Sequence, residues 1–96
     1  MDTKVNLAIQ VLPLGIAKAA AYSIIDEAIR IIDVSGLKYK VCPFETVVEG
    51  TYSEVIQLIA DVQEGCRRAG AEEVLVNMKL QRNFVRDVAI EDKVKE

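Results

Sequence analysis

The feature that most constrains the fold is a change of hydrophobic period that occurs twice along the chain. Residues 4–12 alternate between apolar and polar side chains, as in a strand with one buried face. Residues 17–35 instead carry apolar side chains at every third or fourth position, and Gly36 follows directly. This spacing predicts an amphipathic helix with a glycine at its C-terminal end.

The middle of the chain predicts a hairpin. Residues 37–42 and 46–49 are short runs rich in strand-forming residues, and the Pro43-Phe44-Glu45 break between them is short. Two strands joined so tightly should be antiparallel neighbours.

The second change of period follows at once. Thr51 and Glu54 have the spacing of a capping box, which predicts the start of a helix. Its apolar positions continue to residue 69, Gly70 ends it, and residues 73–81 alternate again as a last strand. The order strand, helix, strand, strand, helix, strand predicts an α+β fold: a ferredoxin-like βαββαβ sandwich with two helices on one face of a four-stranded antiparallel sheet.

Length and composition predict one domain over residues 1–96 and limit what it binds. Apolar residues make up 51% and charged residues 28%, an ordinary globular balance with no apolar run near the ~20 residues of a membrane span. The net charge of −3 and the absence of a basic stripe argue against nucleic acid. Without a secretory pattern, Cys42 and Cys66 are expected to be reduced thiols in the cytoplasm.

The chain lacks the residues that several enzyme classes need. The chain has no histidine, which removes Ser-His and Cys-His catalysis and the commonest transition-metal ligand. The loop at residues 13–16 has no arginine to hold a phosphate, as acylphosphatases of this topology do, and the chain has no P-loop, GxGxxG or CxxC motif. The strands also lack the aromatic residues of RNA-recognition domains. We therefore expect no catalysis, metal or cofactor.

The sheet face away from the helices, called the open face, is where a functional surface is expected. Its predicted members are Asn6, Ala8, Gln10, Lys38, Lys40, Cys42, Val47, Glu49, Leu75, Asn77, Lys79 and Gln81. Amides and a few charges among small apolar residues suit a solvated face, a face covered by another subunit, or a small-molecule pocket formed partly at such an interface. These three interpretations stay open on the residues alone.

Individual side chains suggest a polar ligand. Glu49 can accept hydrogen bonds from an amino group or balance a cation, and Asn77 can donate and accept at the edge of a heteroaromatic ring. Lys79 fits an exposed or ion-pairing role better. Phe44 can stack on a ligand, pack in its loop or contact a neighbouring subunit.

Several segments are also familiar as a set. They are Gln10-Val11-Leu12-Pro13-Leu14, Gly36-Leu37-Lys38-Tyr39, Pro43 through Gly50 followed by Glu54, Lys79 in the last strand, and Ile90-Glu91-Asp92-Lys93-Val94. In order and spacing, over nearly the whole chain, they resemble the small thiamine-binding protein family.

The resemblance implies a ferredoxin-like subunit of a homotetramer built from dimers. It implies non-catalytic binding of thiamine, or of its hydroxymethylpyrimidine half, in the cytoplasm. Carried over by motif, Thr46 and Glu49 are the first ligand-binding candidates; Asn77, Lys79 and Gln10 follow from the open face. The alternative is a structural or regulatory module whose open face serves assembly or senses another small metabolite.

Overall fold

The computed structural model describes residues 2–93, and every predicted strand and helix is present in the predicted order. The elements are β1 (Lys4–Pro13), α1 (Lys18–Val34), β2 (Lys38–Val41), β3 (Thr46–Thr51), α2 (Tyr52–Arg68), β4 (Val74–Gln81) and the short 3-10 helix η1 (Ile90–Asp92). The predicted bounds differ from these by no more than two residues.

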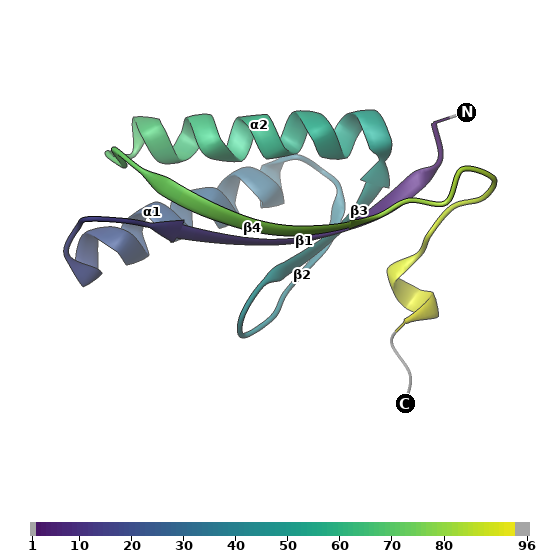
Figure 1. Cartoon of the computed structure of the whole chain (residues 1–96), viewed down its shortest axis with the longest axis horizontal. Helices are drawn as coiled ribbons and strands as arrows, with labels where there is room; N and C mark the ends of the chain where they lie inside the picture. The colour runs from purple at the N-terminus through teal and green to yellow at the C-terminus, as the bar shows by residue number, and fades with distance from the viewer. Residues whose placement is uncertain (1, 94–96) are drawn as a thin grey trace.

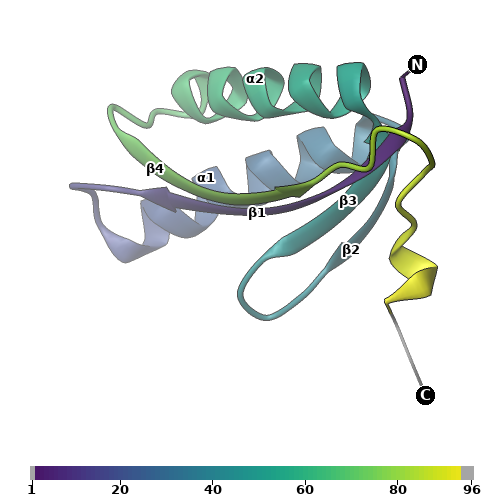
Figure 2. The ribbon, with the colours of Figure 1, turned by 45° about the vertical axis from the view of Figure 1, so that its right-hand side comes forward.

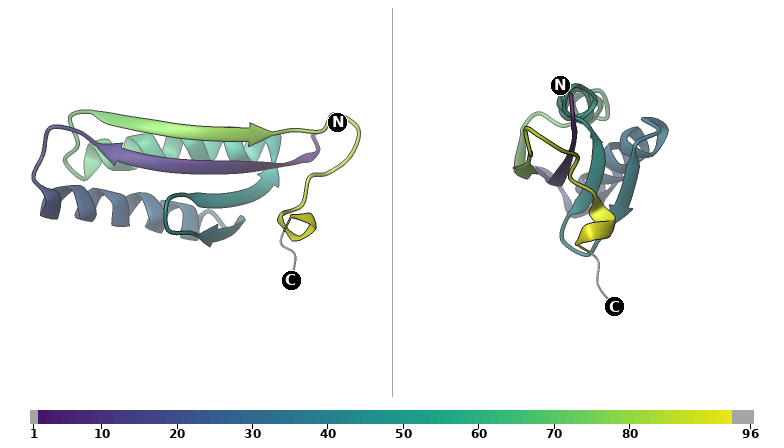
Figure 3. Two further views of the ribbon diagram at one scale, coloured as in Figure 1. Left: turned by 60° about the horizontal axis from the view of Figure 1, so that its bottom comes forward. Right: turned by 90° about the vertical axis from the view of Figure 1, so that its right-hand side faces the viewer.

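The four strands form one antiparallel sheet in the order β2-β3-β1-β4. The two central strands come from different strand-helix-strand halves: β1 from the first half and β3 from the second. The two halves therefore interlock. Both helices lie on one side of the sheet (Figures 1 and 3). The predicted ferredoxin-like α+β fold is therefore confirmed.

The core lies between the sheet and the two helices. Val5, Leu7 and Ile9 of β1, with Val48 of β3, are almost fully buried. The helices cover them with one apolar face each: Ile24, Ala28, Ile31 and Ile32 from α1, and Val55, Leu58, Val62 and Cys66 from α2. The alternation and the helical stripes read from the sequence thus face each other.

The helix ends follow the local signals. Thr51 accepts a hydrogen bond from the Glu54 backbone amide, and the Glu54 carboxylate accepts one from the Thr51 amide, so the predicted capping box is present. Gly36 has φ +79°, a left-handed conformation that costs other residues energy, and it turns the chain from α1 into β2.

The edge strand β4 differs from the prediction in its burial. Met78 and Leu80 pair with Ile9 and Leu7, so they lie on the helix side as expected. They are nevertheless 47% and 43% exposed, because β4 is an edge strand and only its first half is covered. An edge strand with exposed apolar side chains can pair with a further chain.

The residues after β4 turn back across the sheet. Within this segment the structure has η1, a single 3-10 turn, and residues 94–96 lie outside the described part. Figures 1 and 2 show this segment and α2 on opposite sides of the sheet. Within residues 2–93, no helix has both the length and the apolarity to cross a bilayer.

Candidate functional site

The strand register divides the predicted site residues between the two faces of the sheet. Glu49 pairs with Asn6, Asn77 with Gln10, and Lys79 with Ala8, all on the open face. Cross-strand partners share a face. Thr46 pairs with the core residue Ile9, so it lies on the helix side and is only 6% exposed. Thr46 is therefore separated from the other four candidates by the sheet itself.

Residues of the open face form rows across the strands. The first row is Lys38, Glu49, Asn6 and Gln81; the second is Lys40, Val47, Ala8 and Lys79; the third is Gln10 and Asn77; the fourth is Leu12 and Leu75. In the third row the Asn77 side-chain amide donates to the Gln10 Oε1 atom at 3.1 Å. Predicted candidates therefore occupy three neighbouring rows.

The first row is covered by the C-terminal segment, residues 82–93. The Glu49 carboxylate accepts a hydrogen bond from the backbone amide of Ile90 at 2.7 Å, and Ile90 is 8% exposed. With its amide oriented to suit its surroundings, Asn6 donates to the Val88 carbonyl at 2.9 Å and accepts from Lys93 at 3.1 Å. These contacts leave Glu49 and Asn6 with partners from their own chain.

An ion pair at the edge of the sheet holds the same segment. Lys38 Nζ lies 2.6 Å from a Glu91 carboxylate oxygen. The hydrogen bond from Lys38 lowers the pKa of the Glu91 carboxyl, and the same bond raises the pKa of Lys38. Both side chains are exposed, so solvent weakens their attraction.

A second anchor lies where the segment leaves β4. The Arg82 guanidinium lies 3.8 Å from the centre of the Tyr52 ring and 5.0 Å from that of Phe84. A cation above an aromatic face is attracted to it. The hydroxyl of Thr3 donates to the Asn83 carbonyl at 2.8 Å. The segment is therefore attached at both ends.

On the helix side, a groove of about 310 Å³ lies between α1, β1 and the β2–β3 hairpin, hereafter the groove. Its polar and aromatic lining comes from Gln10, Tyr22, Phe44, Glu45 and Thr46. Apolar side chains of β1 and α1, among them Ile9 and Ile29, line the rest. Tyr22 is 57% and Phe44 83% exposed, so both rings are accessible from solvent.

The groove exists because β1 is longer than its neighbour. Pairing between β1 and β3 ends at Ile9 and Thr46, whereas pairing with β4 continues to Pro13. Figure 3 shows the hairpin ending part-way along β1. Beyond that point, α1 and the hairpin loop face β1 with no strand between them. Thr46 and Gln10 of the predicted set both line the groove, although the Gln10 side chain bonds Asn77 on the open face.

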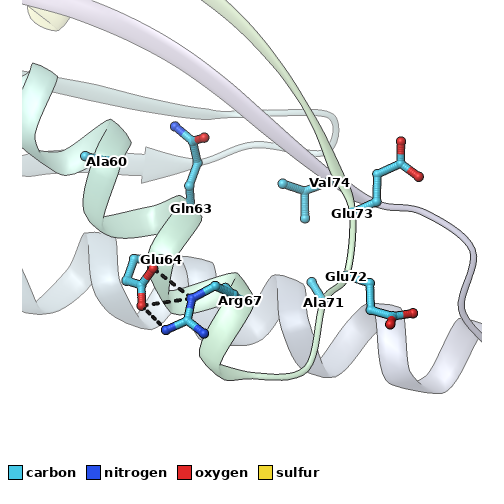
Figure 4. Close-up of a pocket in the computed structure, with 8 residues that line it drawn as sticks. All are labelled: Ala60, Gln63, Glu64, Arg67, Ala71, Glu72, Glu73 and Val74. Carbon is cyan, nitrogen blue, oxygen red and sulfur yellow. Dashed lines mark hydrogen bonds and ion pairs between the residues drawn. The ribbon is translucent and has the colours of Figure 1, made fainter.

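Another hollow, of about 410 Å³, lies between α2 and the start of β4 (Figure 4). Most of its charged side chains either bond to each other or point away from the hollow. Arg67 Nε donates to Glu64 at 2.9 Å, and Glu72 and Glu73 point away from the hollow in Figure 4. The groove, with its aromatic rings and buried hydroxyl, is the better ligand site.

Within residues 2–93, no group of three or more His, Cys, Asp and Glu side chains is placed to hold a metal ion. Both cysteines of the chain are free, and burial raises the pKa of the Cys66 thiol.

Fold and groove together define a ferredoxin-like α+β domain with a cavity at the small end of the range for small-molecule sites. The chain belongs to the thiamine-binding protein family, whose pattern matches residues 7–96. The predicted family membership is confirmed.

Related proteins agree with this assignment. A UPF0045 protein of Clostridium perfringens is 32% identical over 80 residues, covering 83% of this chain and 82% of that protein. A Bacillus cereus domain of unknown function, DUF77, is 33% identical with a TM-score of 0.89, over 96% of this chain and 88% of that one. A Thermotoga maritima protein for which a role in thiamine biosynthesis or salvage is suggested is 27% identical, with a TM-score of 0.86 over 95% of both chains.

The sequence reasoning missed Tyr22 and the groove itself. A signal was present: the first predicted strand, residues 4–12, is more than twice as long as the third, residues 46–49, so part of it had to lack a neighbour on that side. Alternation also places Thr46 on the face opposite Val47 and Glu49, which were predicted to lie on the open face. No comparable pattern in the sequence indicates the contacts of the C-terminal segment with the sheet.

Proposed function

We propose that this protein binds thiamine, or its hydroxymethylpyrimidine half, in the groove without catalysing a reaction. The observation that carries the proposal is the groove of a thiamine-binding family member, which combines two accessible aromatic rings with a buried hydroxyl. The suggested salvage role of the Thermotoga maritima relative supports the same ligand class.

The chemistry of the groove suits both halves of thiamine. The rings of Tyr22 and Phe44 offer stacking surfaces for a flat heterocycle and attract the thiazolium cation. The Thr46 hydroxyl can donate or accept at the pyrimidine edge, and the Glu45 carboxylate supplies negative charge. Apolar walls from β1 and α1 bury the remaining ring surface.

The predicted site residues take different parts in this proposal. Thr46 contacts the ligand, and Gln10 contributes to the same wall while held by Asn77 on the open face. The ligand roles of Glu49 and Lys79 stay predictions. Glu49 already bonds the Ile90 amide, and Lys79 lies in an exposed row on the opposite face from the groove.

A binding role without catalysis agrees with the residues that meet in the groove. The chain contains no histidine to act as a general base near neutral pH. The polar residues of the groove are placed as donors and acceptors along its wall. The proposal therefore includes no reaction, no cofactor, and neither nucleic acid nor a membrane as a partner.

Self-association is part of the proposal, as a homotetramer or homodimer. Exposed apolar side chains on β4, with Leu75 at 49% and Met78 at 47%, accompany an unpaired strand edge. The same observation favours the second candidate function, a module whose purpose is assembly. We place the protein in the cytoplasm, which agrees with two free cysteines.

Isothermal titration calorimetry of variants tests the site. Thr46→Val removes the groove hydroxyl while keeping the side-chain shape, and we expect it to weaken thiamine binding by about three- to tenfold. Lys79→Ala, on the opposite face, should leave the dissociation constant unchanged. Weaker thiamine binding in Lys79→Ala with normal binding in Thr46→Val would place the ligand on the open face. A smaller particle in Lys79→Ala, with no thiamine binding in any variant, would favour the assembly module.

A further inference from the structure

The backbone of β1 points alternately toward β4 and toward β3. Lys4 turns to the β4 side, where its amide donates to Asp87 at 2.8 Å and its carbonyl accepts from Val88 at 2.9 Å. Thr3 turns to the β3 side, where its carbonyl accepts from the Tyr52 amide at 3.2 Å. Odd-numbered residues of β1 therefore direct both backbone groups toward β3.

Val11 is an odd-numbered residue beyond the end of β3. The last β1–β3 pair is Ile9 with Thr46, so the Val11 amide and carbonyl face the groove instead of a strand. Among residues 2–93, Val11 has no strand partner on this side, and no backbone hydrogen bond from a turn or loop reaches either group. The next odd residue, Pro13, has no amide hydrogen, and Leu14 donates to Glu73 on the other side.

We infer that the Val11 amide and carbonyl form the polar recognition edge of the groove, and that they bind a heteroaromatic ring carrying an exocyclic amino group next to a ring nitrogen. In an extended residue the N–H and C=O lie side by side and point the same way, which is how a strand edge captures a partner. The ring nitrogen accepts from the Val11 amide, and the amino group donates to the Val11 carbonyl.

This inference rests on the proposed function and adds an orientation to it. The aminopyrimidine half of thiamine has such an edge, whereas the thiazolium ring has no amino group beside a ring nitrogen. The pyrimidine therefore lies along β1, and the thiazolium extends toward Glu45 and the exposed Phe44 ring in the hairpin loop. Rings without an amino donor beside a ring nitrogen should bind less tightly.

The test is a nitrogen-15 NMR titration of the full-length protein with 4-amino-5-hydroxymethyl-2-methylpyrimidine. We expect the Val11 amide signal to move downfield and its hydrogen exchange to slow at least tenfold. The amide of Ile9, already paired with Thr46, is the internal reference and should change little. The analogue that lacks the 4-amino group should bind about three- to tenfold more weakly, because it loses the bond to the carbonyl.

A backbone variant gives a second readout. Val11→Pro removes the amide hydrogen that faces the groove and keeps the ladder to β4, whereas Val11→Thr keeps both the amide and the branched shape. We expect weaker pyrimidine binding in the first variant and near-normal binding in the second. If Val11→Pro does not fold, the titration of the unmodified protein decides.

The outcomes separate this inference from the proposed function. Saturable pyrimidine binding with an unchanged Val11 amide would overturn the inference and leave the proposed function standing. Saturable binding with equal affinity for the deaminated analogue would also overturn it. Failure of both thiamine and the pyrimidine to bind at millimolar concentration would overturn the proposed function and the inference together.

Discussion

Replacing Glu49 tests whether its carboxylate holds the C-terminal segment or binds the ligand. In the structure its oxygen accepts the Ile90 amide at 2.7 Å in a half-buried setting, on the face opposite the groove. We predict that Glu49→Ala releases the C-terminal segment and leaves thiamine affinity unchanged within about twofold, because the carboxylate does not line the groove.

The size of the effect follows from the contact. A net contribution of about 1.5–3 kcal/mol is usual for a hydrogen bond to a charged group. Losing it lowers the local opening free energy of the segment by that amount, which speeds amide hydrogen exchange at Ile90 by about ten- to hundredfold. Glu49→Gln keeps an acceptor without the charge and should show a smaller increase.

Hydrogen exchange and calorimetry on the same samples measure both quantities. Glu72→Ala is the matched control, since this exposed carboxylate lies in the turn before β4, and Figure 1 shows that turn and the C-terminal segment at opposite ends of the molecule. The reasoning is refuted if Glu49→Ala weakens thiamine binding tenfold while exchange at Ile90 stays slow. That result would restore the ligand role predicted from the sequence.

Three further predictions concern packing, charge and the groove. A methyl group on Gly65 would lie 1.9 Å from Ile31 Cδ1, so Gly65→Ala should destabilise by about 0–2 kcal/mol in urea unfolding, and should stabilise in an Ile31→Val background. The Glu91 carboxylate stabilises the folded protein at pH values above the pKa that it has in the unfolded chain, and this stabilisation is lost as the pH falls through its lowered pKa in the folded state. In Lys38→Met, the NMR titration midpoint of Glu91 should rise to its ordinary value. Phe44→Ala should weaken thiamine binding about tenfold and change unfolding free energy by less than about 0.5 kcal/mol, because the ring is 83% exposed.

The fold could be predicted because its signals are local. Alternation in β1, the stripes of α1 and α2, the capping box at Thr51 and the glycine after each helix are each short-range patterns, and their order selects the topology. Met78 and Leu80 were placed on the right face, but their exposure depends on which strand lies at the edge, and alternation does not report that.

The site was predictable only in part. Thr46 and Gln10 line the groove, but the sequence argument grouped Thr46 with residues that the sheet places on its other face. The bond from Ile90 to Glu49 spans 41 residues and uses a backbone amide, which every residue has, so no residue type announces it. The free backbone edge at Val11 follows from strand length, a property of the pairing and not of the side chain.

The position of the ligand is the central claim, and intermolecular nuclear Overhauser effects measure it most directly. The full-length protein would be saturated with thiamine, and contacts from the pyrimidine methyl protons would be recorded. The account predicts contacts to the Tyr22 and Phe44 rings and to methyl groups of β1 and α1 that line the groove. Contacts to Ala8 and Val47 on the open face, or no saturable binding, would contradict it.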